Sequence, residues 1–148
     1  MAHANTIRRI RFSEIESFVP QKPGIYEIYT DAGLALKVGI GVNIRKRLLQ
    51  HRASRQDRLK LKIGGHRSNP SDVRSKESIL AKHLYYDAAV APDYDLKSEA
   101  GRRAFLEERC HVRFEVCPNK TAARYHEEVR ERQGHFRYVR TVLIRRNP

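Results

Sequence analysis

The stretch GIYEIYTDAGLALKVGIGVNIRKRLLQH, residues 24–51, decides the fold. Its alternating aromatic and β-branched residues predict a strand over 24–30 and a second strand over 34–40. Asp and Gly are turn formers, so residues 30–33 predict the hairpin turn between these strands. The apolar spacing that follows predicts a helix from Asn43 to about Ala53.

The length of the hairpin loop decides which polar side chains can meet. Side chains in a strand alternate between the two faces. With a four-residue loop, Tyr26 lies opposite Lys37 on one face, with Cβ atoms ~5 Å apart. A two-residue loop keeps both residues on one face without opposing them, and a three-residue loop without a bulge separates them.

The predicted helix carries a polar stripe. Asn43, Arg47 and His51 are spaced by four residues, so at ~100° per residue all three lie along one side of the helix. Ile44 and Leu48 form the neighbouring apolar stripe, which predicts contact with a core. Asn43 is a suitable N-cap, and the free N–H groups at a helix start can bind an anion.

These residues together resemble the GIY-YIG nucleases. Gly24-Ile25-Tyr26 matches the first signature, and Lys37-Val38-Gly39 stands where that family usually has Tyr-Ile-Gly. The resemblance covers residues 12–52, including five residues of the predicted helix: Asn43, Ile44, Arg47, Leu48 and His51. Lys37 replaces the second tyrosine of the signature, as in some restriction endonucleases of this superfamily.

The resemblance implies a site that cuts phosphodiester bonds. It makes Tyr26 the candidate base, although a free tyrosine has a pKa near ~10 and needs assistance. Lys37 either favours the phenolate by its charge, is itself deprotonated, or holds the scissile phosphate. Arg47 would bind the phosphate and stabilise the developing charge, and His51 would relay a proton or hydrogen-bond the phosphate.

The resemblance also implies one divalent cation, Mg²⁺ or Mn²⁺, bound by a glutamate on a later helix. A helix is predicted from Thr121 to about Gln133. The family pattern has an alanine four residues before the glutamate, which selects Glu127 through Ala123. Glu128 is the alternative ligand. Such hard ions prefer oxygen ligands and keep several waters.

The charge of the chain predicts a polyanionic partner. The net charge is +13, from 30 Lys and Arg against 17 Asp and Glu, and the pI is near 10.2. Such a basic balance in a small domain is typical of nucleic-acid binding, and we expect DNA. Eight residues in the basic region after the second strand are predicted contacts: Asn43, Arg45, Lys46, Arg52, Arg55, Arg58, Lys60 and Lys62.

The remaining chain completes one expected domain, residues 1–148, with an insertion at about 54–109. Within that insertion, residues 59–63 predict an edge strand or extended arm, and helices are predicted over 72–89 and 98–109. We expect the insertion to widen the DNA-binding surface or to set specificity. The fold class is accordingly α/β (α+β), a small, mainly antiparallel three-stranded sheet flanked by helices.

The C-terminal part predicts a strand over 110–117 and ends ambiguously. Cys110 and Cys117 lack a metal-binding spacing and are expected to be buried, reduced thiols on opposite faces of that strand. Gly134 is expected to end the helix before it. The final stretch, residues 135–144, is compatible with either a strand or a short helix.

The function expected from these patterns is a metal-dependent DNA endonuclease, with sequence-specific restriction among its candidate roles. The alternative is a nucleic-acid-binding module that keeps the fold without cutting, and an RNA-directed nuclease is a third reading. A homodimer would suit the cutting of palindromes. No run approaches the ~20 apolar residues of a membrane span, and residues 1–11 lack a stretch of signal-peptide length, so we expect a cytoplasmic protein.

Overall fold

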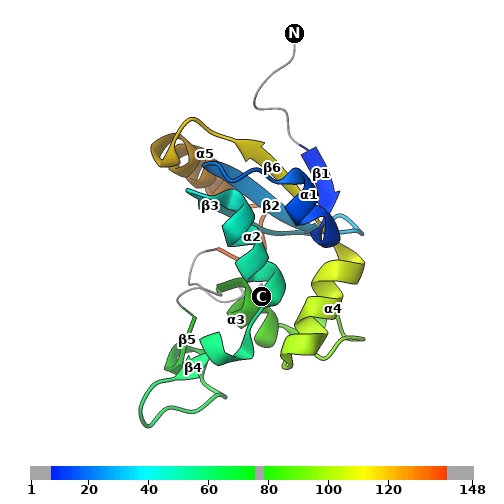
Figure 1. Ribbon diagram of the computed structural model, residues 1–148. Helices are drawn as coiled ribbons and strands as arrows, with labels where there is room; N and C mark the ends of the chain where they lie inside the picture. The colour runs from blue at the N-terminus through cyan, green and yellow to red at the C-terminus, as the bar shows by residue number, and fades with distance from the viewer. Residues whose placement is uncertain (1–7, 76–78, 140–148) are drawn as a thin grey trace.

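The computed structural model describes residues 8–75 and 79–139. Its centre is an antiparallel sheet in the order β1-β6-β2-β3 (Figure 1). The strands are β1 (Arg8–Arg11), β2 (Gly24–Thr30), β3 (Ala35–Gly41) and β6 (Cys110–Val116). The α/β class with a mainly antiparallel sheet is confirmed, but the prediction of three strands is wrong because the sheet has four strands in the described part of the chain.

Strand β1 was not predicted because its sequence has little alternation. Ile10 is the single apolar residue of this strand, and three arginines surround it. The strand forms by pairing with β6, where Ile10 lies opposite Val112 and is buried. Tertiary pairing therefore decides this element rather than local propensity.

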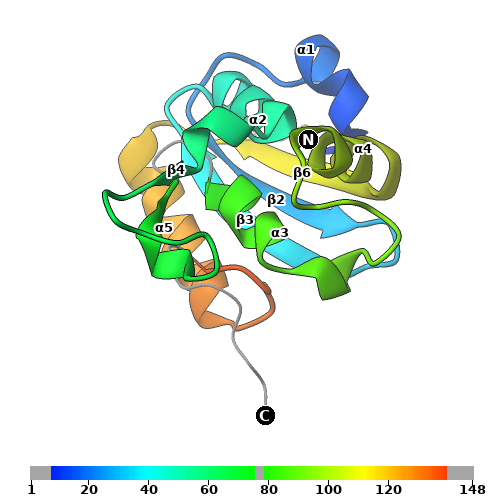
Figure 2. The same cartoon turned by 90° about the horizontal axis from the view of Figure 1, so that it is seen from below.

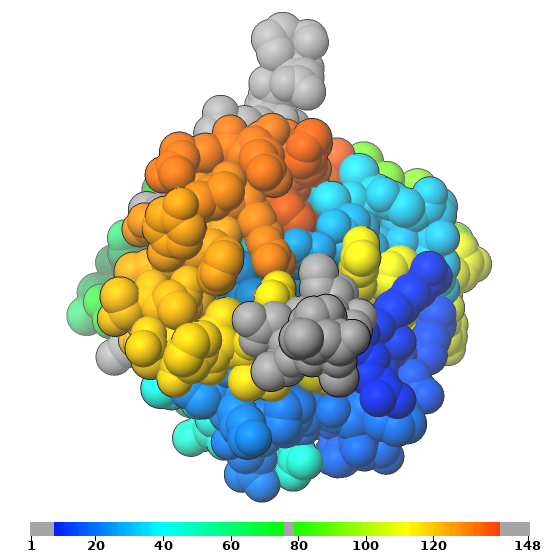
Figure 3. All heavy atoms as spheres, turned by 90° about the horizontal axis from the view of Figure 1, so that it is seen from above, coloured from blue at the N-terminus to red at the C-terminus, as the bar shows by residue number. Residues whose placement is uncertain are grey.

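Helices cover both faces of the sheet. The α-helices are α1 (Ile15–Phe18), α2 (Ile44–Ala53), α3 (Ile79–Tyr85), α4 (Glu99–Arg109) and α5 (Lys120–Arg132). Short 3₁₀ turns occupy Phe12–Glu14, Gln56–Arg58, Pro70–Asp72 and Ala88–Val90. Helices α2, α3 and α4 lie below the sheet, as the view from below shows (Figure 2). Helix α5 lies above it, while β6 and β1 reach the surface beside this helix (Figure 3).

The two faces of β2 belong to two different apolar clusters, as the alternation of a strand requires. Tyr26 and Ile28 belong to the larger cluster, which is shared with α2, α3 and α4. Ile25 faces the other way and packs with Val38 and Ala123 beneath α5. Strand β2 is thus covered on both sides, and its polar side chains lie in a largely dry environment.

The insertion at 54–109 is only partly helical. The predicted helix over 98–109 is confirmed as α4, with Ser98 accepting a hydrogen bond from the Gly101 N–H as its N-cap. The predicted helix over 72–89 is wrong at both ends, because Val73–Arg74 forms strand β5 and α3 ends at Tyr85, while residues 76–78 lie outside the described residues. This strand pairs with β4 (Lys60–Leu61), which confirms the expected short strand.

The C-terminal segments agree with the prediction except at the start of α5. Asn119 is its N-cap and accepts a hydrogen bond from Ala122 N–H, so the helix begins before Thr121. Gly134 ends the turn after α5 with a φ of +79°. Beyond it, Arg137 and Tyr138 donate backbone hydrogen bonds to the β3 edge, while residues 140–144 lie outside the described residues.

Both cysteines are free and buried, in different apolar clusters, as expected for opposite faces. Over residues 8–75 and 79–139, no helix has the length and apolarity needed to cross a membrane.

Candidate active site

The hairpin register differs from the simplest prediction. Tyr26 lies opposite Gly39 and Ile28 lies opposite Lys37. Tyr29 pairs with Ala35, so Leu36 is an extra residue that forms a bulge. The four-residue loop is wrong: Thr30 N–H donates to the Leu34 carbonyl, so residues 31–33 form a three-residue loop, and the bulge compensates for its length. Tyr26 and Lys37 are therefore not directly opposed, but both side chains lie on one face, diagonally placed across β2 and β3.

Two signature glycines allow close approach around Tyr26. A Cβ at Gly39 would overlap the Tyr26 hydroxyl and ring, so the phenol occupies the space that a side chain would take. A Cβ at Gly24 would lie 2.5 Å from the Glu115 carbonyl oxygen and 3.0 Å from Ile44. These contacts explain why the hairpin needs glycine at both positions.

The Gly39→Ala variant is expected to lose about 1–3 kcal/mol of unfolding free energy, because the new methyl group overpacks the space of the Tyr26 phenol. Urea denaturation measures this loss. The same substitution in a Tyr26→Leu background should cost less, since leucine lacks the hydroxyl and ring carbons that the added Cβ would overlap. Equal losses in both backgrounds would contradict this account of the glycine.

Tyr26 and His51 form a buried pair. The Tyr26 hydroxyl and His51 Nε2 are 2.7 Å apart, and both side chains are about 1% exposed. Nδ1 of His51 is buried and has no hydrogen-bond partner among residues 8–75 and 79–139. A buried N–H without an acceptor is costlier than a bare lone pair, so Nε2 carries the proton and donates to the Tyr26 oxygen. Burial also lowers the pKa of His51 well below its usual range, so the ring is neutral.

A cavity of about 290 Å³ gathers the predicted site residues from four elements. Tyr26 comes from β2, Lys37 from β3, Arg47 from α2 and Glu127 from α5. His51 lies behind Tyr26 and does not line the cavity.

Two cations of the cavity wall were not predicted. Lys120 and Arg124 precede Glu127 on α5 by seven and three residues, which places all three on one helical side. That spacing was visible in the sequence. Charge on one side of a helix is common, however, and only the packing of α5 against β3 directs this side to the cavity.

Burial controls the protonation of the two strand residues. It raises the pKa of Tyr26 to about 12, although Arg47 opposes this shift. It lowers the pKa of Lys37 to about 8, an effect that Glu127 opposes and Arg47 reinforces. The cation that favours the phenolate is thus Arg47, and not Lys37 as in the first of its three predicted roles.

The Lys37→Met variant is expected to be more stable than the wild type by about 3 kcal/mol at neutral pH. Burial lowers the pKa of Lys37 from its ordinary 10.5 to about 8 in the folded state. This lowering equals the free-energy cost of keeping the charged amine buried, and methionine does not have that cost. Below pH 8 both folded and unfolded wild type bind this proton, so the full difference is present. Between pH 8 and 10.5 only the unfolded wild type keeps this proton. The wild type therefore becomes more stable as the pH rises, and the difference in unfolding free energy between the two proteins shrinks.

Urea denaturation of both proteins at pH 7 and 9.5 measures this difference. The Lys46→Met variant is the matched control, because this lysine is exposed and should show no such gain. A Lys37→Met protein less stable than the wild type at pH 7 would contradict the burial penalty.

The two candidate metal ligands on α5 line different cavities. Glu127 supplies its carboxylate, whereas Glu128 lines a different cavity with Glu131. In the described part of the chain, no group of three or more His, Cys, Asp or Glu side chains is placed to hold a metal. Mg²⁺ is commonly bound through one or two carboxylates, with waters and substrate phosphates completing its shell. Glu127 is the one carboxylate among the described residues that line this cavity, so it is the side chain that would hold such an ion.

The predicted nucleic-acid contacts divide into three groups. Five of the eight line a cavity of about 590 Å³ on the outer side of α2: Asn43, Arg45, Lys46, Arg55 and Arg58. Arg52 instead forms two hydrogen bonds of 2.8 and 2.7 Å with Glu16 and a third with the Phe12 carbonyl, so it fastens α2 to the N-terminal segment. Lys60 and Lys62 lie farther away, at and beside β4.

Asn43 occupies its predicted cap position. Its side chain accepts a hydrogen bond of 3.0 Å from the Lys46 N–H at the start of α2. It does not line the cavity that holds Arg47, although both share the polar stripe. The three residues of the stripe thus lie in different surroundings. Asn43 caps the helix near solvent, Arg47 lines the cavity, and His51 is buried in the core.

Comparisons with known proteins give no match to this chain among family models, curated proteins or solved structures.

Proposed function

We propose that this protein is a metal-dependent DNA endonuclease of the GIY-YIG type. One observation carries the proposal: Tyr26, Lys37, Arg47 and Glu127 come from four separate elements and line one small cavity. A phenol, an amine, a guanidinium and a carboxylate are the groups that phosphodiester hydrolysis needs for proton transfer, charge stabilisation and metal binding. The net charge of +13 supports a polyanionic substrate.

In this proposal Arg47 binds the scissile phosphate. Its guanidinium is held by a hydrogen bond of 3.0 Å from Nη1 to Gln50 Oε1. Arginine presents a planar fork of donors that matches phosphate oxygens. A guanidinium fixed before the substrate arrives stabilises the charge that develops on these oxygens. Lys120 and Arg124, across the cavity, add positive charge that would attract the neighbouring phosphates of the DNA backbone.

Lys37 accepts the proton of the attacking water. Its pKa of about 8 lies much closer to neutral pH than the value of about 12 for Tyr26, so Lys37 is the better-matched base. Tyr26, held by the His51 N–H, uses its hydroxyl to orient the water. A divalent ion on the Glu127 carboxylate would supply further positive charge for the phosphate and the leaving oxygen.

The cutting rate is therefore expected to rise with pH through about 8 and then level off, because a larger fraction of Lys37 becomes the neutral amine. Single-turnover rates between pH 6 and 9 measure this profile. The Lys37→Arg variant keeps the charge but cannot lose its proton, so it should cut slowly with no rise near pH 8. A wild-type rate that falls above pH 8 would instead show that charged Lys37 is required.

The function itself is tested by incubating supercoiled plasmid with the wild type in Mg²⁺ or in EDTA. We expect nicked or linear DNA in Mg²⁺ alone, and weaker cutting by the Tyr26→Phe variant. An RNA of similar length, run in parallel, identifies the preferred substrate. Salt-sensitive DNA binding without metal-dependent nicking would contradict the proposal.

The second candidate is a nucleic-acid-binding module without cutting activity. The observation that favours it is the buried Tyr26, whose pKa is raised to about 12 and whose hydroxyl is already engaged by His51. On this reading, the cavity binds a backbone phosphate and performs no chemistry.

A further inference from the structure

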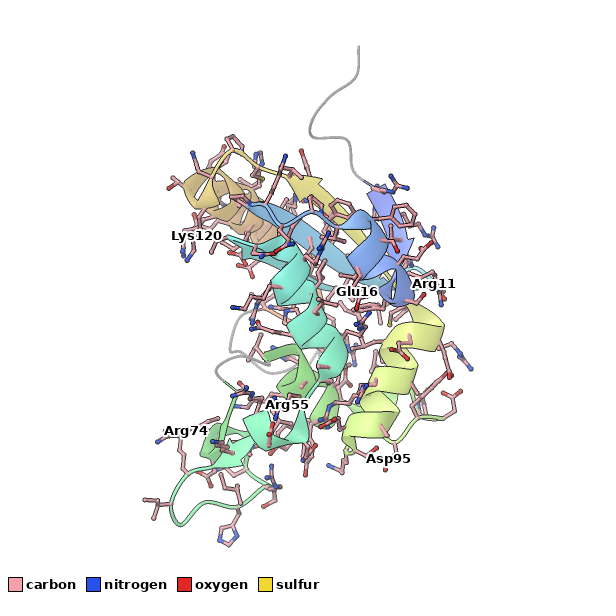
Figure 4. All side chains as sticks on the ribbon, viewed as in Figure 1. Arg11, Glu16, Arg55, Arg74, Asp95 and Lys120 are labelled. Atoms are coloured by element: carbon pink, nitrogen blue, oxygen red, sulfur yellow. The ribbon has the colours of Figure 1, made fainter. Side chains whose placement is uncertain are left out.

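The β4–β5 ribbon, residues 60–74, is a two-stranded element separate from the main sheet. It consists of β4, β5 and the loop 62–72 that joins them. The ribbon lies at one end of the molecule, on the same side as α5 in both views (Figures 1 and 2). Figure 4 shows Arg74, on the ribbon, and Lys120, beside the candidate active site, along that side.

The ribbon has its own anchor. A two-stranded hairpin alone is marginally stable in water, so it needs packing against another element. Val73 of the ribbon forms a separate buried cluster with Leu59 and Ala81. Two side chains beyond the ribbon hold its backbone: Lys82 Nζ donates to the Val73 carbonyl at 2.7 Å, and the Tyr86 hydroxyl donates to the Arg67 carbonyl at 2.5 Å.

The loop of the ribbon is also ordered by its own hydrogen bonds. Asp72 accepts twice across the loop, from Lys62 N–H at its carbonyl and from His66 N–H at its carboxylate, at 2.8 and 3.1 Å. Gly65 N–H donates to the Lys62 carbonyl, and an added Cβ at Gly65 would lie 2.8 Å from Asp72 Cβ. The ribbon thus has a defined conformation, and its backbone is held by Lys82 of α3 and by Tyr86, which follows α3.

Like charges face each other on the outward side of the ribbon. Lys60 lies directly opposite Arg74, and both side chains are exposed. Directly opposed like charges destabilise a pair of strands, so this arrangement opposes folding unless an anion lies against it. By alternation, Lys62 continues the same face, whereas Val73 is directed to the anchor. Asp72, opposite Lys62, belongs to the same face by this alternation, but its carboxylate accepts a hydrogen bond from His66 N–H. The outward face therefore offers three cations, against one acid, to a polyanion.

An apolar residue lies next to these cations. Ile63 follows Lys62 in the loop, and its side chain is fully exposed. Duplex DNA offers apolar contact at the thymine methyl group in the major groove, which also admits a two-stranded β-ribbon. A basic face beside an exposed apolar residue matches that groove, with its phosphates at the edges and base edges on its floor.

We propose that the β4–β5 ribbon enters the DNA major groove and selects the sequence at which the protein acts. Lys60 and Arg74 contact phosphates or base edges across the groove, and Ile63 contacts bases from the loop. The proposal rests on the proposed function only in taking DNA as the partner. It extends that function from cutting at a phosphate to choosing a site.

The test uses a library of duplexes with a randomised central segment, incubated with full-length protein in Ca²⁺ to measure binding and in Mg²⁺ to measure cutting. Bound and cut molecules are sequenced separately. The test variants are Lys60→Ala/Arg74→Ala and Ile63→Ser. The matched control, Arg9→Ala/Arg103→Ala, removes the same charge from exposed positions on β1 and α4.

We expect the wild type and the control to select the same sequence. Both ribbon variants should lose about tenfold or more of the preference at some positions, while keeping measurable binding. An unchanged sequence preference in the ribbon variants, or no preference in the wild type, would overturn the proposal. A third outcome is that the wild type binds selectively, the ribbon variants lose that selectivity, and no protein cuts DNA. This outcome would contradict the proposed nuclease activity but support sequence selection by the ribbon.

Discussion

Replacement of Arg47 by alanine is expected to slow DNA cutting by about 10²–10³-fold. Arg47 lines the cavity beside Tyr26 and Lys37, and its position is fixed through Gln50 before DNA binds. A preorganised charge of this kind acts most strongly on the transition state, so the single-turnover rate at saturating protein should fall while DNA affinity falls much less. Loss of Arg47 should also raise the pKa of Lys37, because Arg47 is one cause of its depression.

The Lys46→Ala variant is the matched control for Arg47. Lys46 is the adjacent residue of α2, but it lines the outer cavity. Its loss should weaken DNA binding in a salt-dependent manner and leave the saturated cutting rate nearly unchanged. If the two substitutions changed that rate equally, Arg47 would be only a surface contact to DNA, without a role in the transition state.

The Glu127→Gln variant is expected to lose at least about 10³-fold in Mg²⁺-dependent cutting, because it removes the carboxylate that fits a hard cation. The amide has nearly the same shape, so the fold should be preserved. A titration with Mn²⁺ followed by electron paramagnetic resonance measures the loss of metal binding separately from the loss of cutting.

The Glu128→Gln variant separates the two candidate ligands. Glu128 is the next residue of α5 but lines a different cavity, so the Glu128→Gln protein should bind Mn²⁺ and cut DNA as the wild type does. If Glu128→Gln is the inactive variant, the assignment of the metal ligand is wrong. If both variants cut at the wild-type rate, neither Glu127 nor Glu128 serves the reaction.

Local sequence patterns predicted the elements that form the site. The strands of the hairpin and helix α2 lie within about one residue of their expected bounds, because alternation, a turn signal and helical spacing agree over this stretch. Glu127 was selected from the resemblance alone. Its place in the cavity depends on the packing of α5 against β3, which no local pattern specifies.

Features that depend on pairing and burial could not be predicted. The bulge at Leu36 changes the partner of Tyr26, and nothing in the sequence fixes such an extra residue. The pKa values of Tyr26 and Lys37 also follow from depth in the core, where desolvation outweighs the neighbouring charges. The ribbon was hidden because Val73–Arg74 is only two residues long and forms by pairing with a distant strand.

The most direct test of the central claim is a crystal structure of the Tyr26→Phe variant bound to duplex DNA in the presence of Mn²⁺. The account predicts a backbone phosphate in the cavity, in contact with Arg47, and an anomalous Mn²⁺ peak at the Glu127 carboxylate. DNA whose phosphates bypass this cavity, or Mn²⁺ bound elsewhere, would contradict the claim that these side chains form a phosphodiester-cutting site.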